Sequence, residues 1–153
     1  MDIGFTIDRT RIDIRIILII ETKNGYIFQK GNNLNCYWIV DDKIHQNESS
    51  DDAAKRMLEE TFGIITDKIK LNTIVESFYV LSREDCREFC FVYKCKVNRK
   101  IHLSDNYCVF SKEEMETKNI RPKIIFDIIN CKNKSIKYIN AEERMCKNNF
   151  YFA

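Results

Sequence analysis

The apolar pattern between Ile12 and Ile20 constrains the fold of this chain more than any other feature. Isoleucine alternates with Asp13 and Arg15 at first, and the pattern then becomes a continuous apolar run from Ile16 to Ile20. Alternation indicates a strand with one buried face, whereas a continuous short run indicates a strand buried on both faces. We therefore expect one α+β domain over residues 1–153, in which helices cover a sheet.

The N-terminal half predicts further strands and one long helix. Asn24-Gly25 is typical of a hairpin turn and leads into a strand at 26–28, and 37–40 is a short apolar segment. Residues 51–62 have apolar side chains at helical spacing, preceded by a Ser49 or Ser50 cap and followed by Gly63.

The C-terminal half predicts two β-rich runs, 71–81 and 88–97, joined by a charged turn at 82–87. A short helix is expected to begin at Ser111. A second is expected to begin at Arg121-Pro122 and to run to Asn130, because proline suits the first helical turn. A last strand is expected at 136–139, followed by a tail from about 141 to 153.

Composition excludes several classes of protein. The 25 basic and 23 acidic residues give a net charge of +2, too little for binding nucleic acid chiefly through phosphates. The longest apolar stretch is far shorter than a membrane span, and the N-terminus lacks the layout of a signal peptide, so we expect a cytoplasmic protein. Seven cysteines without a C-x-x-C pair and only two histidines argue against disulfides and structural zinc.

The segment 42–64 carries the clearest motif. Its spacing resembles the Nudix box, G-x5-E-x7-R-E-U-x-E-E-x-G-U with U a bulky apolar residue, and the matching positions are Glu48, Arg56, Leu58, Glu60, Gly63 and Ile64. The order of the segments "RIILII", "YW", "ESFYV", "REFCFVYKC" and "NIRP" is similar to that of small MutT-like hydrolases over most of the chain.

This resemblance implies a mixed sheet sandwiched between helices and the hydrolysis of nucleoside-diphosphate-linked or related pyrophosphate substrates. It also implies that box glutamates hold Mg²⁺ or Mn²⁺ through carboxylate oxygens over the diphosphate. Glu48 and Arg56 would pair to fix the loop against the helix, Gly63 would end the helix, and Glu60 would be a metal ligand and catalytic residue.

Three positions depart from the box. Met57 and Thr61 stand where the family has glutamates, and Asp42, preceded by Asp41, stands where it has the opening glycine. A frame shifted by one residue would align Glu59 and Glu60 with the acidic pair, but it requires Phe62 to be an insertion. We use the ungapped frame, in which Glu59 lies about 100° around the helix from Glu60.

Other residues extend the predicted site. Glu88, where similar proteins commonly have "HE", is a candidate to join Glu60 and Glu59 in holding the metal and to act in catalysis, and Glu76 is a second candidate. Arg15 is expected to face phosphates, and Tyr37 and Trp38 are expected to stack on a base. The competing interpretations are surface positions for the charged residues and core packing for the aromatic ones.

Two hypotheses remain. The first is a divalent-metal-dependent hydrolase of a small nucleotide or diphosphate with an impaired or rearranged metal site, and similar proteins are often homodimers. The second is a catalytically inactive nucleotide-binding or protein-interaction module. It is favoured by the lost carboxylates and by Asp41-Asp42, which we expect to change a loop that uses glycine. The net charge disfavours a role in RNA binding.

Overall fold

The computed structural model describes residues 1–32, 35–132 and 135–142. Within these residues the chain forms strands and helices in the order β1 (Gly4–Ile7), β2 (Thr10–Thr22), β3 (Gly25–Lys30), β4 (Tyr37–Lys43), α1 (Ser50–Phe62), β5 (Ile69–Leu81), β6 (Glu84–Lys96), β7 (Tyr107–Phe110), α2 (Lys112–Glu116), β8 (Ile120–Arg121), α3 (Ile124–Asn130) and β9 (Lys137–Glu142).

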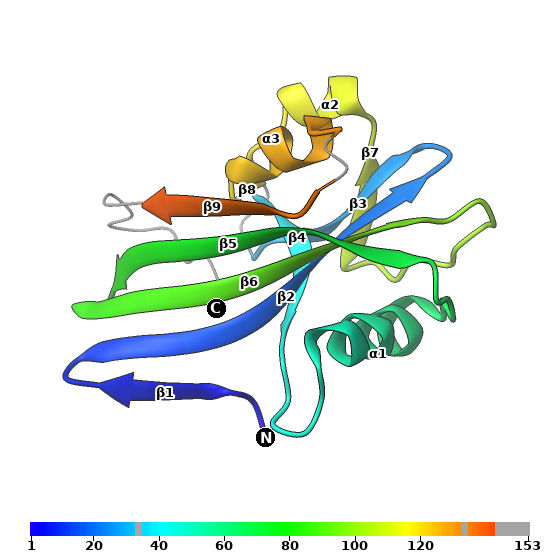
Figure 1. The fold of residues 1–153 in the computed structure, drawn as a ribbon. Helices are drawn as coiled ribbons and strands as arrows, with labels where there is room; N and C mark the ends of the chain where they lie inside the picture. The colour runs from blue at the N-terminus through cyan, green and yellow to red at the C-terminus, as the bar shows by residue number, and fades with distance from the viewer. Residues whose placement is uncertain (33–34, 133–134, 143–153) are drawn as a thin grey trace.

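The strands form one mixed sheet with β2 near its centre (Figure 1). The main order is β7-β3-β4-β2-β6-β5-β9. Strand β2 runs parallel to β6 over its length and antiparallel to β4 and to the short β1. The isoleucine-rich segment is therefore an interior strand, as its pattern predicts.

Side chains of β2 divide the core into two layers. Ile16, Leu18 and Ile20 pack with α1 on one face of the sheet. Ile17 and Ile19 pack on the opposite face, in the core that includes residues of α2 and α3. Figure 1 shows the same arrangement, with α1 on one side of the sheet and α2 and α3 on the other. The sheet sandwiched between helices is confirmed.

Helix α1 begins and ends where the sequence predicts. Ser49 accepts a hydrogen bond from the backbone amide of Asp52, and the Asp52 carboxylate accepts one from the Ser49 amide, which completes a capping box. Gly63 ends the helix at φ 62°, in the left-handed region that favours glycine. Its apolar residues Ala53, Ala54, Met57, Leu58 and Phe62 are buried toward the sheet.

Several local predictions were wrong. The turn between β5 and β6 consists of Ser82 and Arg83, both at positive φ, and residues 84–87 belong to β6. Arg121 lies in β8 and precedes a cis bond to Pro122, so α3 begins at Ile124. The short strands β1, β7 and β8 have too few residues for a clear pattern.

The predicted tail only partly lies within the structure. Residues 141 and 142 are the end of β9, which pairs in parallel with β5, and 143–153 lie outside the described residues. The last strand is thus confirmed with slightly later bounds. No helix in the described ranges is long and apolar enough to cross a membrane.

Two glycines provide a test of the backbone. Gly25 has φ 135°, and an added Cβ would lie 2.1 Å from the carbonyl oxygen of Phe110, whereas a Cβ at Gly63 would meet no atom within 4 Å. We expect Gly63→Ala to lower the free energy of unfolding by about 1 kcal/mol through its positive φ alone. Gly25→Ala should lower it by about 3 kcal/mol or more. Urea denaturation measures both, and equal losses would contradict the placement of Gly25.

Candidate functional site

The loop before α1 is fixed to the helix by Arg56. Its Nε and Nη2 donate hydrogen bonds to the Glu48 carboxylate at 3.0 and 2.8 Å, and Nη1 donates to Asp42 Oδ2 at 3.0 Å. Nη2 also donates to the backbone carbonyl of Lys43 at 3.2 Å. Glu48 and Arg56 thus form the ion pair that the ungapped frame predicts. Lys55, which the frame shifted by one residue would place at the arginine position, pairs with Asp51 and Asp67 instead.

The electrostatics of this loop follow from the same contacts. Hydrogen bonds from Arg56 lower the pKa of Glu48 from 4.5 to about 2. Asp42 and its neighbour Asp41 are residues of β4 and lie outside the positive-φ residues of the described chain. In this chain, therefore, neither aspartate stands at a backbone position that needs the freedom of glycine. Asp42 instead provides an additional acceptor for Arg56.

The two helix positions at which the resemblance places glutamates, Met57 and Thr61, contact each other. Met57 is 9% exposed and belongs to the core between α1 and the sheet. Thr61 donates its hydroxyl to the Met57 sulfur at 3.3 Å. A thioether packed in an apolar core is not a ligand for Mg²⁺, which requires oxygen. This side of the helix is part of the protein core.

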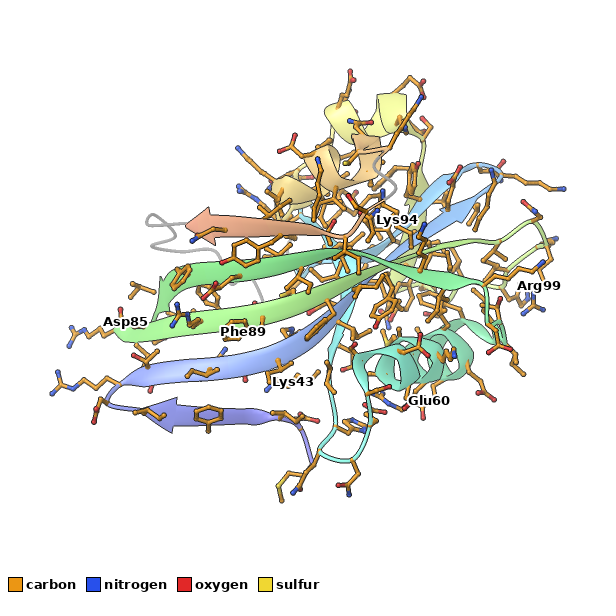
Figure 2. The ribbon with its side chains drawn as sticks, viewed as in Figure 1. Lys43, Glu60, Asp85, Phe89, Lys94 and Arg99 are labelled. Carbon is orange, nitrogen blue, oxygen red and sulfur yellow. The ribbon has the colours of Figure 1, made fainter. Side chains whose placement is uncertain are left out.

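The remaining helix carboxylates face solvent. Glu59 is exposed, and the Glu60 side chain is 68% exposed, with Oε2 3.6 Å from Arg56 Nη1. Figure 2 shows Glu60 on α1, far along the molecule from the end of β6 labelled at Asp85. Glu60 therefore pairs with Arg56, one turn earlier on the same helix.

Glu88 lies on the other face of the sheet. It alternates along β6 with residues that face α1, and its companions Cys90 and Val92 belong to the core that includes α2 and α3 residues. Its side chain is fully buried, and Tyr79 donates a hydrogen bond to Oε1 at 2.8 Å. The sheet therefore separates Glu88 from α1. The prediction that Glu88 joins Glu60 and Glu59 at one metal is wrong.

Glu88 belongs to a buried charged cluster that the sequence did not predict as a unit. Arg15 donates Nε to Asp41 Oδ2 at 2.8 Å, and Asp13 lies within ion-pair distance of Arg11 and Lys43. Asp13 and Arg15 occupy the positions of β2 that alternate with its α1-facing residues, and Asp41 does so on β4. The sequence does contain a signal for this cluster. Asp13, Arg15, Ile17 and Ile19 are every second residue of β2, and such residues share one face of the sheet.

Burial determines the protonation of this cluster. Desolvation raises the pKa of Glu88 from 4.5 to about 7, with Asp41 and Asp13 adding to the rise, while Arg15 and Tyr79 oppose it. Desolvation also raises the pKa of Asp41 despite its pairing with Arg15. A buried carboxyl group with a shifted pKa is a candidate functional group, although structural networks produce such shifts as well.

The donor set does not fit Mg²⁺ or Mn²⁺. Among the described residues there is no group of three or more His, Cys, Asp or Glu placed to hold a metal ion. The box positions instead provide a sulfur, a hydroxyl bonded to it, and solvent-exposed carboxylates. Hard cations need several oxygens that converge.

The predicted substrate contacts are not assembled either. Arg15 is buried and bonded to Asp41, so its guanidinium holds the charged cluster together. Tyr37 packs edge-on against Phe110 with ring centroids 4.7 Å apart, in the core on the α2 and α3 side. Trp38 follows it in β4 and points to the opposite face, beside Gly31. The two rings do not form one stacking site.

A different aromatic surface lies on the face that carries α1. The Arg87 guanidinium sits 4.5 Å from the Phe78 ring centroid and 5.8 Å from that of Phe89. It also pairs with Glu76 at 2.7 Å, and Glu76 accepts a hydrogen bond from Tyr138. Figure 2 shows Phe89 on the part of the sheet that extends beyond α1. We call Phe78, Arg87 and Phe89 the aromatic platform.

The ion pair of the box loop predicts a pH-dependent stability. Because the pKa of Glu48 is lowered, its contribution is complete above about pH 4.5 and is lost as the pH falls toward 2. Glu48→Gln should lower the free energy of unfolding at pH 7 by about 2 kcal/mol, with the difference shrinking in acid. Chemical denaturation across pH measures this, with the exposed Glu59→Gln as control. A difference independent of pH would contradict the assignment.

Glu88 predicts the opposite pH dependence. Its raised pKa means that the folded state binds the proton more tightly, so stability falls as the pH rises from about 4.5 to 7 and then levels off. Glu88→Gln, which still accepts the Tyr79 hydrogen bond, should remove this fall in stability. The free energy of unfolding of the variant minus that of the wild type should be larger at pH 8 than at pH 4 by up to about 3 kcal/mol. Denaturation midpoints test this, with exposed Glu84→Gln as control. Parallel curves for wild type and Glu88→Gln would refute it.

No protein-family model matches the sequence, and no curated protein matches it. Solved structures do share its fold. The MutT protein from Bacillus halodurans superposes with a TM-score of 0.65 at 13% identity, over 84% of this chain and 90% of that one. The C. elegans Ap4A hydrolase superposes with a TM-score of 0.56 at 13% identity, over 77% of this chain and 93% of that one.

The Nudix domain of Shewanella oneidensis NrtR, solved in complex with ADP ribose, gives a TM-score of 0.59 at 10% identity, over 76% of this chain and 84% of that one. These likenesses extend over most of the described sheet and helices. They agree with the mixed sheet between helices. The chain therefore has the fold of the Nudix hydrolases.

Proposed function

We propose that the protein is a Nudix-fold binding module that holds a nucleotide or related diphosphate without hydrolysing it. The observation that carries this proposal is the contact between Thr61 and Met57. Two positions that resemblance assigns to metal-binding glutamates are occupied by a buried thioether and the hydroxyl bonded to it. Hydrolysis assisted by Mg²⁺ requires carboxylate oxygens at that place.

The box retains a structural function in this proposal. Arg56 joins Glu48 and Asp42 to the helix, so the loop is held by side-chain contacts. Its interaction with Glu60 at 3.6 Å places a positive charge next to the exposed carboxylate that would be the metal ligand. A cation at that distance competes with a divalent metal for the carboxylate.

The aromatic platform is the candidate surface for the ligand. Phe78 and Phe89 offer ring faces for a base, since stacking on aromatic side chains makes little demand on base identity. Arg87, which lies against both rings and pairs with Glu76, would exchange that carboxylate for a phosphate of the ligand. The platform lies on the α1 side of the sheet, away from the buried charged cluster. The ADP-ribose complex of the NrtR domain provides a precedent for ligand binding by this fold.

A divalent-metal-dependent hydrolase is the second candidate. It is favoured by Glu59 and Glu60, which remain on the exposed side of α1, and by the Ap4A hydrolase among the proteins of the same fold. In this alternative, a substrate phosphate would complete a rearranged set of metal ligands.

Binding and turnover separate the candidates. We expect ADP-ribose or another nucleoside diphosphate derivative to bind without added metal and to remain uncleaved with Mg²⁺ or Mn²⁺, as followed by calorimetry and chromatography. Phe89→Ala should weaken binding about tenfold or more by removing a stacking partner, whereas Phe89→Tyr should retain it. Metal-dependent cleavage by the wild type that Glu60→Gln abolishes would establish the hydrolase instead.

Restoring the missing carboxylates is the complementary test. Met57→Glu with Thr61→Glu should create metal binding and, if the substrate is seated, slow cleavage, because three helix carboxylates would then be available. The melting temperature of the double variant shows whether it remains folded. If the wild type cleaves the substrate and the double variant cleaves it no faster, the two missing carboxylates do not limit cleavage. That result would contradict the proposal.

A further inference from the structure

A second surface of the molecule has the features of a binding site, and none of the residues that line it belongs to the box. A cavity of about 390 Å³ lies between the turn that joins β2 to β3, the segment 99–103 and β7. This volume falls within the range of small-molecule sites. Arg99, which lines it, is labelled in Figure 2 near the end of the sheet opposite the turn between β5 and β6.

The base of the cavity is aliphatic. Ile27 is fully buried, and Ile101, Leu103 and Val109 are half-buried and pack against the α1 side of the core. Ile101 and Leu103 lie in a stretch without regular secondary structure that follows β6. Apolar side chains in such a stretch form a hydrophobic floor that an apolar group can cover.

The rim of the cavity is cationic. Lys23, Arg99 and Lys100 line it, and the described lining residues include no carboxylate. In the ranges that the structure describes, these three side chains take part in no ion pair, although Arg99 Nη2 donates a hydrogen bond to the Gly63 carbonyl at 2.5 Å. That bond holds one cation in place at the rim. Uncompensated positive charge beside an apolar floor complements a ligand that is anionic and partly apolar.

The described lining also contains no aromatic side chain, so the cavity lacks a stacking surface for a nucleobase. This distinguishes it from the aromatic platform. We propose that the cavity at the β2–β3 turn binds a small anion with an aliphatic body, with the chain on the half-buried Ile101, Leu103 and Val109 and the phosphate or carboxylate head between Lys23 and Lys100.

Calorimetry with octyl phosphate and octanoate tests this proposal on the full chain. Octanol and inorganic phosphate are the matched controls, since each lacks one half of the ligand. We expect at least one of the two amphiphilic anions to bind, and both controls to bind at least about tenfold more weakly. The head group preferred identifies phosphate or carboxylate as the natural chemistry. Failure of both anions to bind, or equal binding of inorganic phosphate, would overturn the proposal.

Variants locate the binding. Lys23→Gln with Lys100→Gln should weaken binding roughly tenfold, because two charges at the rim are removed. Lys112→Gln on α2 removes the same charge elsewhere and should have no effect. Leu103→Asp should abolish binding by placing a carboxylate on the floor. Phe89→Ala should leave binding intact, which separates this site from the aromatic platform. Unchanged binding in the double lysine variant would overturn the proposal.

Discussion

The burial of β2 on both faces determines which residues of this protein can meet. Successive side chains of a strand point to opposite sides, so Ile16, Leu18 and Ile20 belong to one core and Ile17 and Ile19 to the other. The neighbouring strand β6 follows the same division, because it pairs with β2 in an unbroken parallel register. Glu88 therefore lies across the sheet from α1, whatever its position in the sequence suggests.

The helix and loop of the box depend on that division as well. Helix α1 covers the face of Ile16, Leu18 and Ile20, and its own buried stripe includes Met57. The position assigned to a glutamate by resemblance is thus part of the hydrophobic contact between helix and sheet. Glu48, Asp42 and Arg56 hold the loop to the exposed side of the same helix. The contacts of Arg56 thus give this segment a structural role in the chain.

The fold could be predicted from the sequence largely because its strongest signals are local. The pattern of β2, the Asn24-Gly25 turn and the Ser49 and Gly63 caps each depend on residues close in sequence. The pairing of Glu48 with Arg56 was predictable because the resemblance to the Nudix box assigns these two residues to one pair. The site was predicted less well. Which face Glu88 occupies depends on strand parity, and the pairings of Arg15 with Asp41 and of Arg87 with Phe78 depend on register between strands distant in sequence.

Our proposal requires that α1 forms no divalent-metal site in this protein. Paramagnetic broadening of amide resonances by Mn²⁺ tests it most directly, because broadening falls steeply with distance from a bound ion. We expect no selective loss of the Glu59, Glu60 and Thr61 resonances at stoichiometric Mn²⁺, with or without a nucleoside diphosphate. Selective, saturable broadening of those resonances that Mg²⁺ reverses would contradict it.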